Sequence, residues 1–151
     1  MGKSWKSGDG KLGFLQPLIG RWTAEGKSVE LGSFRCTRTF ETVLGGSFVR
    51  LEAGWEFGGG GQVYEEYALI GSDDEGKVCF WSFTSDGKRS QGTRADVTDL
   101  HPEAVGFEAQ MPAGLARFAY WPDEDGGFVW VAESKDPKGW SRFVEHHYRP
   151  A

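Results

Sequence analysis

Short strand-like runs recur along this chain at regular intervals, and turn residues separate them. After Gly20, runs of roughly six to ten residues alternate with turn signals such as Gly45-Gly46 and Asp86-Gly87. Gly-Gly and Asp-Gly between two alternating runs are typical of tight β-hairpins. Helical repeats do not separate the runs, which argues against a parallel sheet with crossover helices.

The pattern predicts an all-β fold of about ten short antiparallel strands. The segment from Leu12 to Ile19 contains Pro17, and we expect a short helical turn there that ends at Gly20. The predicted strands lie near Arg21–Lys27, Phe34–Leu44, Ser47–Phe57, Gln62–Gly71, Lys77–Thr84, Lys88–Thr98, Val105–Gln110, Leu115–Trp121, Phe128–Ser134 and Trp140–Arg149.

Closing such a sheet on itself removes its exposed edges. A barrel of more than about eight strands has an interior too wide for side chains alone to fill. We therefore predict a single up-and-down β-barrel over residues 11–151 with an internal pocket, after a flexible tail at residues 1–10. A two-sheet sandwich built from the same strands stays open as the alternative.

Composition narrows the class of partner. The chain has 151 residues and a net charge of -5, with 17 Lys and Arg among 22 Asp and Glu, so we expect no nucleic-acid binding. No stretch approaches the ~18 apolar residues of a membrane helix, and the segment from Met1 to Gly10 is polar, without the apolar run typical of a signal peptide. We expect a cytoplasmic protein without membrane contact. Cys36 and Cys79 each lie inside a strand-like run, which favours buried free thiols in a reducing compartment.

Two sequence segments resemble a known superfamily. Gly20 and Trp22, after a Pro-Leu-Ile run, resemble the opening of calycin-superfamily barrels, in which a short helical turn leads into Gly-x-Trp on the first strand. The later segments 67–73 and 81–87 resemble lipocalin-like bacterial proteins of unassigned function, near the nitrobindin-like barrels. The resemblance implies that Trp22 closes the base of the barrel and that a late arginine, Arg142 or Arg149, packs across it.

A small-molecule site is the leading functional hypothesis. Arg38 alternates with Phe34, Cys36 and Phe40 on the apolar face of its strand, so an inward guanidinium could hold a carboxylate or an enolate oxygen. The alternative for Arg38 is a cross-strand ion pair with Glu41 or Glu52. We predict binding of a small hydrophobic or amphipathic ligand, fatty-acid-like or an aromatic acid. The predicted ligand-binding residues are Arg38, Phe40, Trp55, Tyr67, Trp81, Tyr120, Trp130 and His147.

Two alternatives use the same cavity. A small lyase or isomerase would use Glu66 or His147 as general base, because an inward carboxyl in an apolar barrel is suited to proton transfer. Haem binding is implied only by the resemblance, since nitrobindin-like barrels hold iron through one histidine on the last strand. Phe143 falls at that position here, and His146 and His147 are displaced from it. We otherwise expect no cofactor and no metal, and a homodimer is left open.

Overall fold

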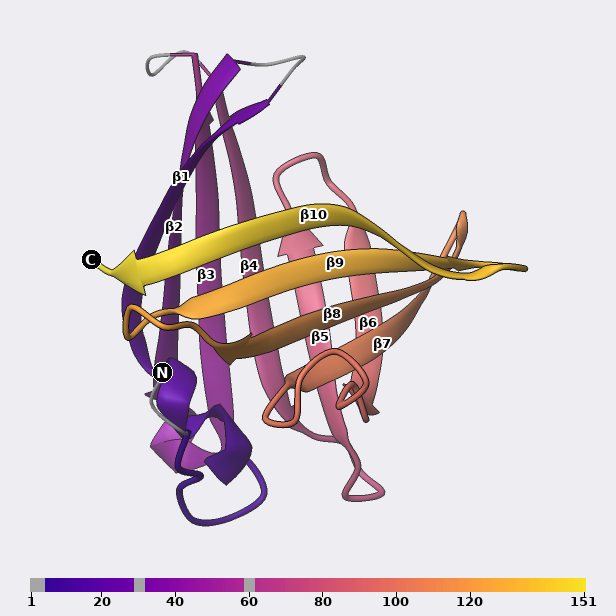
Figure 1. Ribbon diagram of the computed structural model, residues 1–151. Helices are drawn as coiled ribbons and strands as arrows, with labels where there is room; N and C mark the ends of the chain where they lie inside the picture. The colour runs from indigo at the N-terminus through magenta and orange to yellow at the C-terminus, as the bar shows by residue number, and fades with distance from the viewer. Residues whose placement is uncertain (1–4, 29–31, 59–61) are drawn as a thin grey trace.

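The structure is a computed structural model that describes residues 5–28, 32–58 and 62–151. Ten antiparallel strands form a closed barrel, so the predicted fold is confirmed (Figure 1). A 3₁₀ turn, η1 (Gly13–Leu18), precedes the barrel, and a second, η2 (Leu44–Gly46), joins two strands. The strands are β1 (Gly20–Ser28), β2 (Gly32–Val43), β3 (Phe48–Phe57), β4 (Gln62–Ser72), β5 (Val78–Thr84), β6 (Arg89–Ala95), β7 (Val105–Met111), β8 (Gly114–Pro122), β9 (Phe128–Asp136) and β10 (Gly139–Pro150).

Each strand pairs with the next one along the chain, and β10 returns to β1 to close the barrel. This seam is short: Trp22 pairs with Pro150 and Thr23 with Arg149. Beyond these pairs the two strands separate, and Figure 1 shows β10 crossing the steeply inclined β1. A closed ladder excludes the two-sheet sandwich.

Alternation along each strand decides which side chains fill the interior. On β2, Cys36, Arg38 and Phe40 are buried while Arg35 is exposed, as the sequence pattern predicted. On β5, whose residues are apolar on both faces, Phe80 belongs to the central core. The sequence could not say which face of β5 turns inward, and the structure settles it.

The η1 turn closes one end of the barrel. Leu15 and Leu18 are fully buried, and the Trp22 indole nitrogen Nε1 donates a hydrogen bond to the Leu18 carbonyl oxygen at 2.8 Å. The Trp22 ring also meets Phe128 edge-on, with ring centroids 4.9 Å apart. Gly20 has a φ of 138°, which L side chains rarely adopt, so glycine is required where η1 turns into β1. Gly20 and Trp22 thus anchor the end of the barrel.

The expected packing of Arg142 on Trp22 is wrong. Arg142 lies on the outer face, where its guanidinium carbon is 5.5 Å from the Trp121 ring centroid and its Nε donates to Glu133. In the described part of the chain, no Arg or Lys lies over the Trp22 ring. The base of the barrel is therefore closed by η1 and by aromatic contacts.

The segment expected to be a loose tail includes a packed residue. Residues 1–4 lie outside the described residues, but Trp5 packs against the central core, and its backbone N–H donates to Glu103 Oε1 at 3.2 Å. Among the described residues, no helix has the length and apolar character needed to cross a membrane.

Candidate functional site

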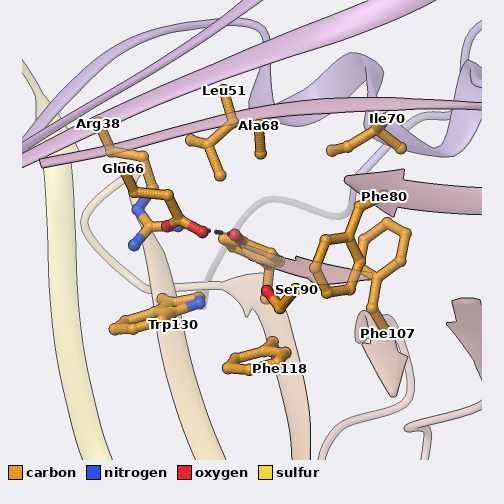
Figure 2. Close-up of a pocket in the computed structure, with 11 residues that line it drawn as sticks. Arg38, Leu51, Glu66, Ala68, Ile70, Phe80, Ser90, Phe107, Phe118 and Trp130 are labelled. Carbon is orange, nitrogen blue, oxygen red and sulfur yellow. Dashed lines mark hydrogen bonds between the residues drawn. The ribbon is translucent and has the colours of Figure 1, made fainter. Parts of the chain in front are cut away.

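The barrel encloses a small cavity with one polar and one apolar end. Its volume is about 70 Å³. Figure 2 shows Arg38 and Glu66 together beside Trp130 at one end, and Phe80 and Phe107 at the other. Its walls come from the eight strands β2 to β9, and the lining residues are Arg38, Leu51, Glu66, Ala68, Ile70, Phe80, Ser90, Phe107, Phe118, Tyr120 and Trp130.

Arg38 is the most unusual of these residues because its charged side chain is only 1% exposed. Its Nη1 donates to the Tyr120 hydroxyl at 2.8 Å and its Nε to the Tyr148 hydroxyl at 3.4 Å. Its Nη2 is buried and has no hydrogen-bond partner in the described part of the chain. The predicted alternative, an ion pair with Glu41 or Glu52, does not form.

Glu41 and Glu52 instead form ion pairs with Arg50 on the outer face. Arg38 therefore keeps a buried positive charge whose hydrogen-bond partners among the described residues are neutral hydroxyls. Its guanidinium carbon also lies 4.3 Å from the Trp130 ring centroid, a cation–π contact that partly replaces water.

The protonation states of this group follow from burial. Burial alone would lower the pKa of Arg38, but the Tyr120 and Tyr148 hydroxyls and Glu66 outweigh it and raise that pKa above its ordinary value. Burial raises the pKa of Tyr120 to about 12 and that of the Cys36 thiol to about 12. At neutral pH the cavity therefore holds a guanidinium cation and a neutral phenol, and the adjoining Cys36 stays a thiol.

Glu66 also faces the cavity. The buried Ser82 on the neighbouring strand donates its hydroxyl proton to Glu66 Oε2 at 2.5 Å. The adjacent residues Glu65 and Tyr67 point outward and are exposed. Of the two predicted catalytic candidates, Glu66 thus lines the cavity together with Arg38.

The predicted ligand-binding residues divide into two groups. Arg38, Tyr120 and Trp130 line the cavity, Phe40 packs on Tyr120 with ring centroids 5.6 Å apart, and Trp55 lies 5.8 Å from the Arg38 guanidinium carbon. The other three predicted residues do not line it. They are Tyr67, which is 45% exposed, Trp81, which packs on Phe48, and His147.

His147 lies on the outer face, where both ring nitrogens are occupied: Nδ1 lies 3.0 Å from Asp123 and Nε2 2.8 Å from Glu145. The inward histidine is His146, packed against the Trp130 ring at 5.3 Å. Burial and the neighbouring Arg38 lower the pKa of His146 to about 4, so it is neutral at pH 7. His147 does not fit an iron ligand, and the described residues contain no cluster of three or more metal-binding side chains.

A second depression lies where β1 and β10 separate. Its volume is about 480 Å³, and Trp130 belongs to its lining as well as to that of the central cavity. The rest of its aromatic wall consists of Phe34, Trp55, Phe57, Tyr64, Phe143 and His146. We call this depression the mouth.

Sequence reasoning missed most of the apolar walls. Phe80, Phe107 and Phe118 occupy inward positions on three different strands, and Phe80 and Phe107 meet edge-on at 5.5 Å. The alternation of side chains along each strand could have predicted that each of them points inward. It could not have shown that all three line the same cavity.

No protein-family model and no curated protein matches this chain. The closed antiparallel barrel of ten strands is consistent with the calycin-like resemblance of the Gly20-to-Trp22 segment. The functional argument therefore depends on the site itself.

Proposed function

We propose that this protein binds a small amphipathic molecule in the central cavity, with the polar group at Arg38 and the apolar body against Phe80 and Phe107. The observation that carries the proposal is the buried Arg38, which lines the cavity and has one nitrogen without a partner in the described chain. A buried guanidinium nitrogen without a hydrogen-bond partner destabilises the fold, and a bound polar group would offset that cost.

The cavity volume narrows the ligand class. A volume of about 70 Å³ is about half that of an apolar protein cavity of ~150 Å³ that holds benzene. A long fatty acid, a large aromatic acid and haem all exceed this space. We therefore narrow the sequence-based hypothesis to ligands with at most about six non-hydrogen atoms, no larger than benzene, such as four-carbon amides, acids and alcohols.

Titration of the protein with butan-1-ol, butyramide and butyrate tests the proposal. We expect saturable shifts in the NMR signals of cavity residues with at least one of these probes. Ala68→Leu should abolish the shifts because it fills the cavity from β4. Leu69→Phe, on the opposite face of the same strand, is the matched control and should leave them unchanged. Saturable binding of none of the three probes would refute the proposal.

Catalysis in the same cavity is a second candidate, favoured by one observation: Glu66 lines the cavity beside Arg38. A carboxylate and a guanidinium around one small space could remove a proton next to a carbonyl group and stabilise the resulting enolate. On this reading Glu66→Gln would abolish turnover while a carbonyl compound still binds. Equal loss of affinity and turnover would argue for binding alone.

A further inference from the structure

The charged groups around the cavity balance one another. Arg38 and Glu66 are the only Arg, Lys, Asp or Glu residues that line it within the described chain. Their formal charges, +1 and -1, sum to zero. They do not form a direct ion pair, so each keeps hydrogen-bonding capacity for a third group.

The polar end offers both a donor and an acceptor. The Tyr120 hydroxyl accepts from Arg38 Nη1 and still has its own proton to donate. Glu66 Oε2 accepts from Ser82, whereas Glu66 Oε1 has no hydrogen bond in the described residues. A ligand that satisfies this end must accept from one side and donate to the other.

From this arrangement we propose that the ligand's polar group is neutral and carries an acceptor and a donor side by side, as a primary carboxamide does. This inference rests on the proposed binding function and names its ligand class. A carboxylate ligand would add a second negative charge beside Glu66, and it has no proton to donate. A carboxamide keeps the net charge of the site at zero. Its oxygen can accept a hydrogen bond from the Tyr120 hydroxyl, and its N–H₂ group can donate one to Glu66.

The affinities of butyramide and butyrate at about pH 7.5, where butyrate is an anion, test this choice, because the two have the same size and differ in the polar group. We expect wild-type protein to bind butyramide at least about tenfold more tightly, the order of magnitude that one unfavourable like-charge contact produces. Glu66→Gln should reverse the preference, because Arg38 is then the only charge at the site. Glu65→Gln is the matched control: this neighbouring carboxylate is exposed on the outer face, so the wild-type preference should persist.

The outcomes separate the two proposals. Tighter binding of butyrate than of butyramide to wild-type protein would overturn the neutral-ligand inference and leave the binding function intact. An affinity ratio as unaffected by Glu66→Gln as by Glu65→Gln would overturn it too. Binding of neither probe, nor of butan-1-ol, would overturn both proposals. If Glu66→Gln does not fold, the wild-type ratio alone decides.

Discussion

Two buried arginines illustrate how much the partner of a charge matters. Arg117, on the outer face, is 5% exposed and donates to Glu133, which is itself 4% exposed. Arg117→Met would leave Glu133 Oε1 buried without that bond, and we expect a loss of about 3 kcal/mol of unfolding free energy. Arg38→Met would remove the Arg38 hydrogen bonds of two hydroxyls and the cation near Glu66, but Glu66 is only partly buried and keeps its hydrogen bond from Ser82, so a loss of about 1 kcal/mol is expected.

Urea denaturation of both variants at neutral pH measures the difference. A variant of the exposed Arg35 controls for the loss of surface charge. Equal destabilisation by Arg38→Met and Arg117→Met would mean that Arg38 stabilises the fold as much as a true ion pair does, which would weaken the argument for a ligand at Arg38.

The adjacent histidines should have opposite effects on the pH dependence of stability. Hydrogen bonds to Glu145 and Asp123 raise the pKa of His147 above 6.5. The contribution of protonated His147 to the free energy of unfolding is thus fully present below about pH 6.5. It is lost as the pH rises through the pKa of His147 in the folded state. The pKa values of the Glu145 and Asp123 carboxyl groups are both lowered by their contacts with His147. Their contributions to stability are therefore lost only as the pH falls below about 4.5. His147→Gln should therefore lower Tm most between about pH 4.5 and 6.5, and least near pH 9.

His146 behaves the other way. Its pKa of about 4 in the folded state lies below the ordinary 6.5, so between these values the unfolded chain binds more protons, and stability decreases as the pH is lowered from 6.5 to about 4. His146→Phe should flatten the decline in Tm over that interval, whereas His147→Gln should not. Thermal unfolding across the pH range checks both variants, and identical pH profiles would contradict the inward and outward assignment.

At the scale of a strand, close packing depends on a glycine in β6. A Cβ at Gly92 would lie 2.3 Å from Phe80 Cε2 and 2.4 Å from the Glu108 carbonyl oxygen. Gly92→Ala should cost about 1–3 kcal/mol because backbone or core must move. At Gly54 on β3 no atom lies within 4 Å of the added Cβ, so Gly54→Ala should be neutral or slightly stabilising. The urea denaturation midpoints of the two variants measure this difference. Equal effects of Gly92→Ala and Gly54→Ala would contradict the prediction.

The same scale explains which sequence-based site predictions failed. Alternation placed Arg38 inward correctly because β2 has one apolar face. On β5 both faces are apolar, so the pattern could not exclude Trp81. On β10 a bulge between Arg142 and Val144 changes the alternation, which puts His146 rather than His147 inside. Tyr67 could not share a face with Glu66, its neighbour in the strand.

For the whole molecule, the regular turn spacing predicted about ten antiparallel strands, and the calycin-like resemblance favoured a closed barrel over a sandwich, but neither gave the size of the interior. That size depends on how far side chains from distant strands reach across it. Phe107 and Phe118 come from β7 and β8, and together with Phe80 they reduce a wide interior to a small cavity. The cytoplasmic location and the absence of nucleic-acid partners stay predictions.

We expect ligands to enter the barrel at the incomplete seam between β1 and β10. The strands pair only at Trp22 and Thr23, and the mouth opens where they separate. Trp130 lines both the mouth and the central cavity, so a ligand that enters here passes its ring. Phe34 packs on His146 at 5.1 Å across this gap.

Phe34→Ala should therefore widen the mouth without touching the cavity lining. We expect butyramide to associate and dissociate faster, by a similar factor, with little change in affinity, because access lowers the barrier in both directions. NMR exchange rates of cavity signals measure this. Phe83→Ala removes a ring that is 50% exposed on the outer face of β5 and is the control. Exchange rates that match this control would show that ligands enter elsewhere, because only a barrier at the seam responds to the Phe34 ring.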